Sequence, residues 1–494
     1  MSAKAARDPT SRPASISPPP TTTTSAPHAV VIGSGFGGLA AAVRLASRGY
    51  RVTVLERKEA PGGRAITHRE NGFVFDGGPT VVTAPFLFEE LWQLAGRRLE
   101  DDVDLRPVSP FYRIRFSDGE WFDYSGDADK MCSEVERFSP SDVAGYKKFV
   151  RESEAIFKVG FEQLAHVPFG SWSSMARIMP DMMKLQSYRT VYGLAAKYIR
   201  DERLRQVFSF HPLLVGGNPF STTSIYSLIL FLERRWGVHY PIGGTGALVD
   251  GLVKLIEGMG SEVRMNASVE QIIVRHNGKR HRAHGVRLNS GEEIAADIVV
   301  SNADSAWTYK HLVPAEARRR WTDDRIEKSR YSMSLFVWYF GTNRVYGDVA
   351  HHSILLGPRY KELLHDIFKR HFLADDFSLY LHRPTATDPS MAPAGSDTFY
   401  VLSPVPHMDS GVDWQEEAPR YQQRICEFLE RTVLPDLSKH VVASRVLTPQ
   451  MFHDDLQSFK GAAFGMEPVL TQSAYFRPHN ASEDVERLYL VGAG

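Results

Sequence analysis

The spacing of apolar residues changes twice between residues 28 and 56. An apolar run at 29–32 predicts a buried strand, and a turn that contains four glycines follows it. Beyond the turn, Leu39 and Val43 recur at helical spacing, and an apolar run at 52–55 predicts another strand, which ends on Glu56. The pattern therefore predicts a strand, a glycine turn, a helix and a second strand.

The glycine turn and the acid after the second strand predict a dinucleotide site. Gly33 permits the tight turn, Gly35 lets backbone N–H groups approach a pyrophosphate, and Gly38 lets the helix pack closely on the strand. Glu56 lies 18 residues after Gly38, where a carboxylate accepts hydrogen bonds from an adenosine ribose. A fortuitous turn is the alternative. The expected contacts in the turn are Gly33, Ser34, Gly35, Phe36, Gly37 and Gly38.

A second glycine pair follows this acid, in Pro61-Gly62-Gly63-Arg64. Such a pair is unusual in nicotinamide enzymes and resembles the glycine-doublet flavoproteins, which include amine oxidases, protoporphyrinogen oxidases and carotenoid desaturases. The resemblance implies a resident FAD whose pyrophosphate and flavin lie along the pair, with the arginine offsetting phosphate charge. A surface turn with a solvated arginine is the alternative. The residues that this resemblance places on FAD are Arg57, Gly62, Gly63, Arg64, Gly78, Pro79 and Thr80.

Length and composition narrow the class of protein. At 494 residues the chain is too long for one core, so two or three domains are expected. Lys and Arg number 58, as do Asp and Glu, and this net charge of zero does not favour nucleic acid as a partner. The two cysteines, Cys132 and Cys426, predict no disulfide framework and fit a reducing compartment. No metal cluster, Ser-His-Asp set or pair of catalytic acids is evident in the sequence.

The predicted fold class is α/β, with a Rossmann-type FAD-binding domain of the amine-oxidase type and an inserted α+β substrate domain. The leader, rich in Ser, Thr and Pro, is expected to be disordered, with an organellar transit peptide as the alternative. The expected segments are 1–27 for the leader, 28–105, 242–304 and 485–494 for the FAD-binding domain, 106–241 for a helical lid with a membrane-associating region, and 305–484 for the substrate domain.

Later segments complete the expected cofactor site. Short alternating strands are predicted from about 263 to 288, and a buried strand at 298–301 ends in small polar residues. The glycine-rich turn at 243–246 is expected to start a helix, with a second phosphate loop as the alternative. The residues expected to face FAD from these segments and from the end of the chain are Val269, Asn302, Asp304, Gly492 and Gly494.

The sequence closes with an apolar strand at 488–491 and a glycine turn. In the flavoproteins that it resembles, this segment leads into a helix whose N-terminus faces the flavin and the ribityl chain. The resemblance implies that a loop and a final helix follow residue 494, and weak binding of FAD is expected without them.

The insertions are rich in aromatic residues and methionine. The run at 333–340 predicts an aromatic strand with neighbours at 377–381 and 399–402, and a helical pattern fills 140–240. A sheet floored with aromatic residues under a helical lid predicts a long apolar cavity, with ordinary core packing as the alternative for each residue. At 165–200, apolar and cationic residues interleave at helical spacing, which predicts either an amphipathic segment at a membrane interface or a helix pair packed on the core.

Motifs across residues 28–494 resemble those of the bacterial and fungal phytoene desaturases, which are FAD-dependent carotenoid desaturases. They are FVFDGGPT at 73–80, SFHPLLVGGNPF at 209–220, WGV at 236–238 and EPVLTQSA at 467–474. The resemblance implies successive dehydrogenation of phytoene to lycopene, with a three-step, neurosporene-forming reaction as the alternative. It also implies a peripheral position on the cytoplasmic side of a bacterial membrane and quinone or oxygen as electron acceptor, and it is compatible with a homo-oligomer.

The implied reaction needs few polar groups. The flavin accepts a hydride, and at most one side chain takes or relays a proton. His211 and Arg177 are the candidates for that side chain. The alternatives are a buried structural histidine and an arginine at lipid head groups or a helix end. Two other functions stay open, namely an amine oxidase of the same fold and a non-catalytic binder such as the Rab dissociation inhibitors.

Overall fold

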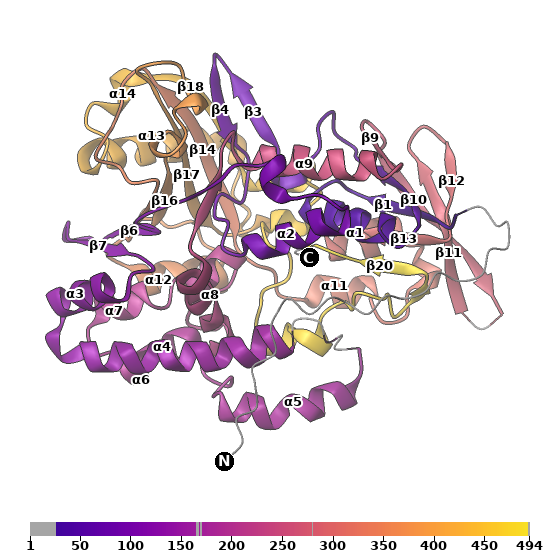
Figure 1. The fold of residues 1–494 in the computed structure, drawn as a ribbon, viewed down its shortest axis with the longest axis horizontal. Helices are drawn as coiled ribbons and strands as arrows, with labels where there is room; N and C mark the ends of the chain where they lie inside the picture. The colour runs from indigo at the N-terminus through magenta and orange to yellow at the C-terminus, as the bar shows by residue number, and fades with distance from the viewer. Residues whose placement is uncertain (1–25, 165–166, 168–169, 279, 493–494) are drawn as a thin grey trace.

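The computed structural model describes residues 26–164, 167, 170–278 and 280–492. Nearly all of the predicted leader and the predicted cofactor contact Gly494 lie outside these residues. In Figure 1 a parallel sheet lies on the right, a seven-stranded sheet on the upper left, and helices beneath both. This arrangement confirms the predicted α/β fold class.

The parallel sheet is built from three segments that lie far apart in the sequence. Both of its faces are covered, so Ala29, Val30 and Val31 have no exposed surface, which explains the unbroken apolar run. All four strand pairs are parallel. In sheet order the strands are β20 (Leu488–Leu490), β13 (Ile298–Ser301), β1 (His28–Ile32), β2 (Arg51–Leu55) and β9 (Glu262–Arg264).

Two helices pack on one face of this sheet. They are α1 (Phe36–Ala46), which follows the glycine turn, and α9 (Thr245–Gly258). Gly244 is the N-cap of α9, so the prediction that the turn at 243–246 starts a helix is confirmed. The other face packs on an antiparallel sheet of β10 (Val269–Asn277), β11 (Arg280–Leu288) and β12 (Glu293–Ala295), which β19 (Val485–Glu486) joins.

The seven-stranded sheet belongs to the segments inserted between the parts of the parallel sheet. The predicted pairing of the aromatic strand with the strand near 400 is confirmed, and the strand near 380 pairs on the far side of the latter. In sheet order the strands are β18 (Val441–Leu447), β14 (Ser334–Thr342), β17 (Asp397–Val405), β16 (Leu379–His382), β15 (His352–Leu355), β6 (Tyr112–Arg115) and β7 (Trp121–Tyr124).

The two faces of β14 have different surroundings. Phe336, Trp338 and Phe340 pack against α13 (Trp414–Thr432), whereas Val337 and Tyr339 face the cluster that contains the helical region. The aromatic run therefore contributes to two separate cores, because side chains alternate between the faces of a strand. Both faces are buried, so the run shows no polar alternation in the sequence.

Helices cover the other face of the seven-stranded sheet. Among the described residues, none of the helices is long and apolar enough to cross a bilayer. In Figure 1, α5 lies at the lower edge of the molecule, away from both sheets. The helices of this region are α3 (Ala128–Phe138), α4 (Val143–Phe157), α5 (Trp172–Lys184), α6 (Val191–Tyr198), α7 (Glu202–Val207) and α8 (Leu228–Trp236).

Short elements connect these layers. Two small antiparallel sheets pair β3 with β4 and β5 with β8. The remaining elements are β3 (Thr67–Glu70), β4 (Phe73–Asp76), α2 (Pro85–Leu94), β5 (Leu105–Pro107), β8 (His239–Pro241), α10 (Ser305–Trp307), α11 (Asp323–Lys328), α12 (Tyr360–His365), α14 (Leu437–His440) and α15 (Pro449–Asp454).

Candidate functional site

The glycine turn between β1 and α1 is held in shape by the acid at the end of β2. Ser34 donates to Glu56 Oε2 from its backbone N–H, at 3.0 Å, and from its hydroxyl, at 2.6 Å. Lys58 N donates to Glu56 Oε1 at 3.0 Å. Because a carboxylate has about four acceptor positions, Glu56 keeps capacity for one further donor, such as a ribose hydroxyl. Val269 begins β10 two residues after Ala267, whose backbone N–H donates to Glu56 O at 2.8 Å.

The second glycine pair lies directly against the first turn. Gly62 N donates to Ser34 O at 3.1 Å, and a Cβ atom at Gly63 would lie 3.3 Å from Gly35 Cα. Gly62 and Gly63 have φ angles of 116° and 58°, in the region that favours glycine. The two glycine motifs, which are separate in the sequence, therefore form one surface of backbone that carries few side chains.

Asn302 and Gly492 close the same surface from β13 and β20. A Cβ atom at Gly37 would lie 2.6 Å from both Asn302 Oδ1 and Gly492 Cα. At Gly35, a Cβ atom would lie 2.8 Å from Asn302 Nδ2. The structure thus brings the predicted contacts Asn302 and Gly492 together with the glycine turn, in a cradle that any side chain would fill.

Two ionic groups beside this cradle, Asp304 and Arg64, lack a full set of polar partners among the described residues. Asp304 Oδ1 accepts from Trp307 N at 3.0 Å, but Asp304 Oδ2 is buried without a hydrogen-bond partner among the described residues. Burial raises the pKa of Asp304 and lowers the pKa of Arg64, and the negative charge of Asp304 partly offsets the effect on Arg64. A polar ligand with hydroxyl groups and a phosphate charge would satisfy both groups. The residues therefore fit FAD.

The remaining predicted contacts are placed as follows. Gly78 packs on the second glycine motif, since a Cβ atom there would lie 2.1 Å from Arg64 O. Arg57 instead donates to Asp454 O at 3.2 Å, and Pro79 is exposed. The ring of Phe36 packs edge-on against Phe88 of α2, with centroids 5.7 Å apart.

Thr80 belongs to a network of polar side chains that could not be predicted from the sequence. Thr80 Oγ1 lies 2.7 Å from Tyr380 OH, which lies 2.7 Å from His352 Nδ1. Burial lowers the pKa of His352 well below its usual value. Asp76, at the end of β4, accepts from Tyr240 OH at 2.7 Å and from Thr245 N at 2.8 Å. Its place in the FDGG stretch before Gly78 was the one sequence signal for this network.

The two predicted catalytic residues lie in different surroundings and are not brought together. His211 is 1% exposed, and its Nε2 lies 3.1 Å from Glu233 Oε2. Tyr112 OH donates to Glu233 Oε1 at 2.7 Å, which makes Glu233 the centre of a buried group of three polar side chains. Arg177 is exposed on α5.

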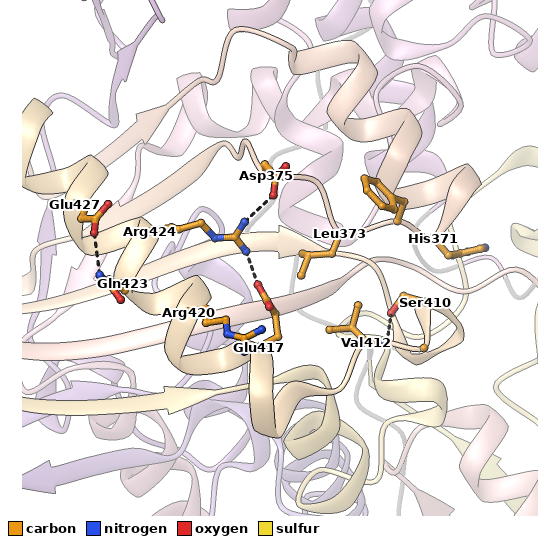
Figure 2. Close-up of a pocket in the computed structure, with 12 residues that line it drawn as sticks. His371, Leu373, Asp375, Ser410, Val412, Glu417, Arg420, Gln423, Arg424 and Glu427 are labelled. Carbon is orange, nitrogen blue, oxygen red and sulfur yellow. Dashed lines mark hydrogen bonds and ion pairs between the residues drawn. The ribbon is translucent and has the colours of Figure 1, made fainter.

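A surface pocket of about 680 Å³ lies away from the glycine turn, between α13 and the loop at 371–375 (Figure 2). Among its charged side chains, Arg424 forms ion pairs with both Asp375 and Glu417. None of the predicted cofactor contacts lines it. This pocket is therefore separate from the candidate cofactor site.

Removing the carboxylate of Glu56 should weaken FAD binding. Glu56→Ala loses the remaining acceptor for the ribose and the contacts that shape the turn, and a charge-assisted hydrogen bond of this kind is worth about 1.5–3 kcal/mol. We expect the affinity for FAD, measured by fluorescence titration, to fall roughly ten- to hundredfold. Glu59→Ala, which removes an exposed acid of the same loop, is the control and should bind like the parent. Equal affinities for both variants would contradict the assignment of Glu56.

Comparisons with known proteins agree with this site. A family model described as flavin containing amine oxidoreductase matches residues 36–494. The lycopene-forming phytoene desaturase of Pseudescherichia vulneris is 49% identical over 466 residues, which cover 94% of each chain. The neurosporene-forming phytoene desaturase of Rhodobacter capsulatus is 48% identical over 472 residues, covering 94% of this chain and 90% of the relative.

Solved structures show the same fold at much lower sequence identity. An oxidoreductase from Methanosarcina mazei aligns with a TM-score of 0.61 and 17% identity, covering 94% of each chain. The family match covers residues 36–494, and the relatives at 48% identity cover 94% of the chain. The chain belongs to the flavin containing amine oxidoreductases and, within them, to the phytoene desaturases.

Proposed function

We propose that this chain is an FAD-dependent phytoene desaturase that converts phytoene to lycopene by successive dehydrogenations. The observation that carries the proposal is 49% identity to a lycopene-forming relative across 94% of both chains. The glycine cradle around Asn302, with the unpartnered oxygen of Asp304 beside it, supports FAD as the cofactor.

Bound FAD would supply the oxidant, because a flavin accepts a hydride from an allylic C–H bond. The chain's own residues hold it in place. The glycine turn presents backbone N–H groups at the start of α1 to the pyrophosphate, and Glu56 receives the ribose. Arg64 balances negative charge, and Asp304 accepts from a hydroxyl group.

Phytoene is a hydrocarbon without polar groups, so the protein must bind it through apolar contacts. Three aromatic residues lie next to the Gly77-Gly78 segment, namely Phe75, Tyr339 and Tyr400. The ring centroid of Tyr339 lies 6.1 Å from that of Phe75 and 5.3 Å from that of Tyr400. Tyr339 OH donates to Gly77 O at 2.8 Å, which fixes this group beside the Gly77-Gly78 segment. Burying several hundred Å² of polyene at about 25 cal/mol per Å² contributes on the order of 10 kcal/mol before ordering costs.

His211 is the candidate for receiving the proton that leaves with each hydride. Its neighbour Glu233, with Oε2 at 3.1 Å, would balance the charge of an imidazolium in a buried site. Arg177 is exposed on α5, so we assign it to contact with lipid head groups rather than to catalysis.

The product of the reaction tests the proposal. The chain, supplied with FAD and with quinone or oxygen as acceptor, is incubated with phytoene in liposomes, and the pigments are separated by chromatography. Lycopene is the expected end product, and accumulation of neurosporene would assign the three-step reaction instead. Unchanged phytoene together with oxidation of an amine would overturn the proposal in favour of an amine oxidase. The Gly35→Val variant serves as the inactive control.

We further propose that the protein associates peripherally with the cytoplasmic side of a bacterial membrane through α5. Met179 and Met183 are 43% and 58% exposed on this helix, and Arg177 and Lys184 are exposed beside them. Exposed apolar side chains interleaved with cations are typical of helices that lie in a membrane interface.

Flotation with anionic liposomes measures this association. The parent chain should float, and high salt should reduce the floating fraction only in part, because apolar insertion persists. The double variant Met179→Asp/Met183→Asp should stay at the bottom of the gradient. Val442→Asp, which changes a comparably exposed residue on β18, should float like the parent. A parent chain that stays at the bottom at every salt concentration would rule out the membrane proposal.

A further inference from the structure

Three histidines meet inside the substrate domain, where the sequence indicated no metal cluster. His352 begins β15 and His382 ends β16, and the antiparallel register places them directly opposite each other. His351 precedes β15, and its ring centroid lies 4.4 Å from that of His352 and 4.8 Å from that of His382. All three side chains are at most 5% exposed.

The ring nitrogens of this cluster are mostly without partners. His351 Nδ1 lies 2.6 Å from Thr387 Oγ1, and His352 Nδ1 lies 2.7 Å from Tyr380 OH. The Nε2 atoms of both histidines, and both ring nitrogens of His382, have no hydrogen-bond partner among the described residues. Buried polar atoms are normally satisfied, so four such atoms in one place point to a bound group.

The cluster has the geometry of a metal site. One ligand atom from each histidine lies within 4.8 Å of the other two. A histidine whose Nδ1 donates to a hydroxyl presents the lone pair of Nε2, and such second partners are typical of metal-binding histidines. A tetrahedral zinc ion with Zn–N bonds of about 2.0–2.1 Å needs ligand atoms about 3.3 Å apart. Among the described residues no hydrogen bond fixes the orientation of the His382 ring.

A carboxylate and a paired cation flank the cluster. Asp76 Oδ2 lies 3.7 Å from His382 Nε2, which is too long for a hydrogen bond but near the separation of two ligands of one metal ion. Arg383 is the neighbouring cation, and its charge is balanced by Asp397, with Nε and Oδ2 3.0 Å apart. Negative charge from Asp76 is therefore available to a divalent cation.

We propose that His351, His352, His382 and Asp76 form a buried zinc site. Three imidazoles and one carboxylate suit Zn²⁺ in tetrahedral geometry. Asp76 belongs to β4, in the predicted FAD-binding segment 28–105. His352 and His382 belong to the seven-stranded sheet, and His351 directly precedes its strand β15. The ion would link the two parts of the molecule. This site is independent of the desaturase activity proposed above.

Metal content tests the site in the FAD-loaded full chain without an affinity tag. After dialysis against a chelator, the protein receives Zn²⁺, is desalted, and is analysed by inductively coupled plasma mass spectrometry. We expect about one zinc ion per chain, and His352→Gln and His382→Gln should each weaken zinc binding at least tenfold. His440→Gln, which removes a half-buried histidine outside the cluster, should retain one ion.

Cobalt substitution gives a second readout that needs no variant. Co²⁺ in a tetrahedral site of nitrogen and oxygen ligands gives intense bands to the red of the flavin absorption, whereas an octahedral, adventitious ion gives only weak ones. Intense bands with one ion per chain would support the site even if the histidine variants fail to fold. Weak bands, or equal metal content in the parent and a His352→Gln/His382→Gln double variant, would overturn it in favour of buried water.

Discussion

Replacing Gly35 by valine should leave the chain without FAD. A Cβ atom at this position would lie 2.8 Å from Asn302 Nδ2, and the two methyl groups beyond it would occupy the surface where backbone N–H groups must meet the pyrophosphate. The turn cannot yield easily, because Gly62 and Gly63 pack against it from the other side. Flavin absorbance per chain after gel filtration should therefore fall by at least about tenfold relative to the parent.

Gly258→Ala is the matched control for this variant. Gly258 ends α9, no atom lies within 4 Å of a Cβ atom added there, and its φ angle is not positive. The control should retain the flavin content of the parent, which would show that substitution of a glycine alone does not release the cofactor. Parental flavin content in Gly35→Val would mean that the dinucleotide does not approach this turn, and the cofactor assignment would have to be abandoned.

The first part of the FAD-binding domain, from β1 to Glu56, could be predicted from the sequence because the residues that define it are close together in the sequence. The strand, the glycine turn, α1 and β2 follow one another without interruption, and Glu56 comes directly after β2. The close packing predicted for Gly38 is present, because a Cβ atom there would lie 2.1 Å from Gly33 O. The predicted contacts Asn302 and Gly492 lie far away in the sequence. The small polar residues at the end of a buried strand indicated Asn302, and the resemblance to a family of known fold indicated Gly492.

The polar network of the substrate domain could not be predicted, because it depends on which strands become neighbours. His352 and His382 are 30 residues apart and meet only through the pairing of β15 with β16. No spacing rule for metal ligands covers such a pair. The orientation of the aromatic run in β14 was missed for a related reason: a strand that is buried on both faces gives no periodicity from which its two sides can be told apart.

Glu233 is the strongest case of a residue whose role only the structure reveals. In the sequence it precedes Arg234 and Arg235 and resembles an exposed helix residue, yet its side chain has no exposed surface. It accepts from Tyr112 OH at 2.7 Å and lies 3.1 Å from His211 Nε2. Both partners are themselves buried, so no solvent can replace the carboxylate.

Glu233→Ala should therefore destabilise the protein more than loss of a typical surface charge. Removing the shared acceptor leaves the buried Tyr112 hydroxyl and the buried His211 ring without these hydrogen bonds, which costs about 1–3 kcal/mol for each group, whereas exposed ion pairs contribute about 0–1 kcal/mol. We expect the free energy of unfolding, followed by tryptophan fluorescence in urea, to fall by this larger amount. Glu257→Ala, at an exposed position of α9, should unfold like the parent.

A third variant separates the charge of Glu233 from its hydrogen bonds. Glu233→Gln keeps an oxygen that can accept from Tyr112 and an amide that can face His211, so it should lose much less stability than Glu233→Ala. If His211 also receives the proton released in each dehydrogenation, Glu233→Gln should slow lycopene formation while its unfolding stays near that of the parent. Glu233→Ala unfolding within about 0.5 kcal/mol of Glu257→Ala would contradict the buried group of three, since changes of that size are typical of surface positions.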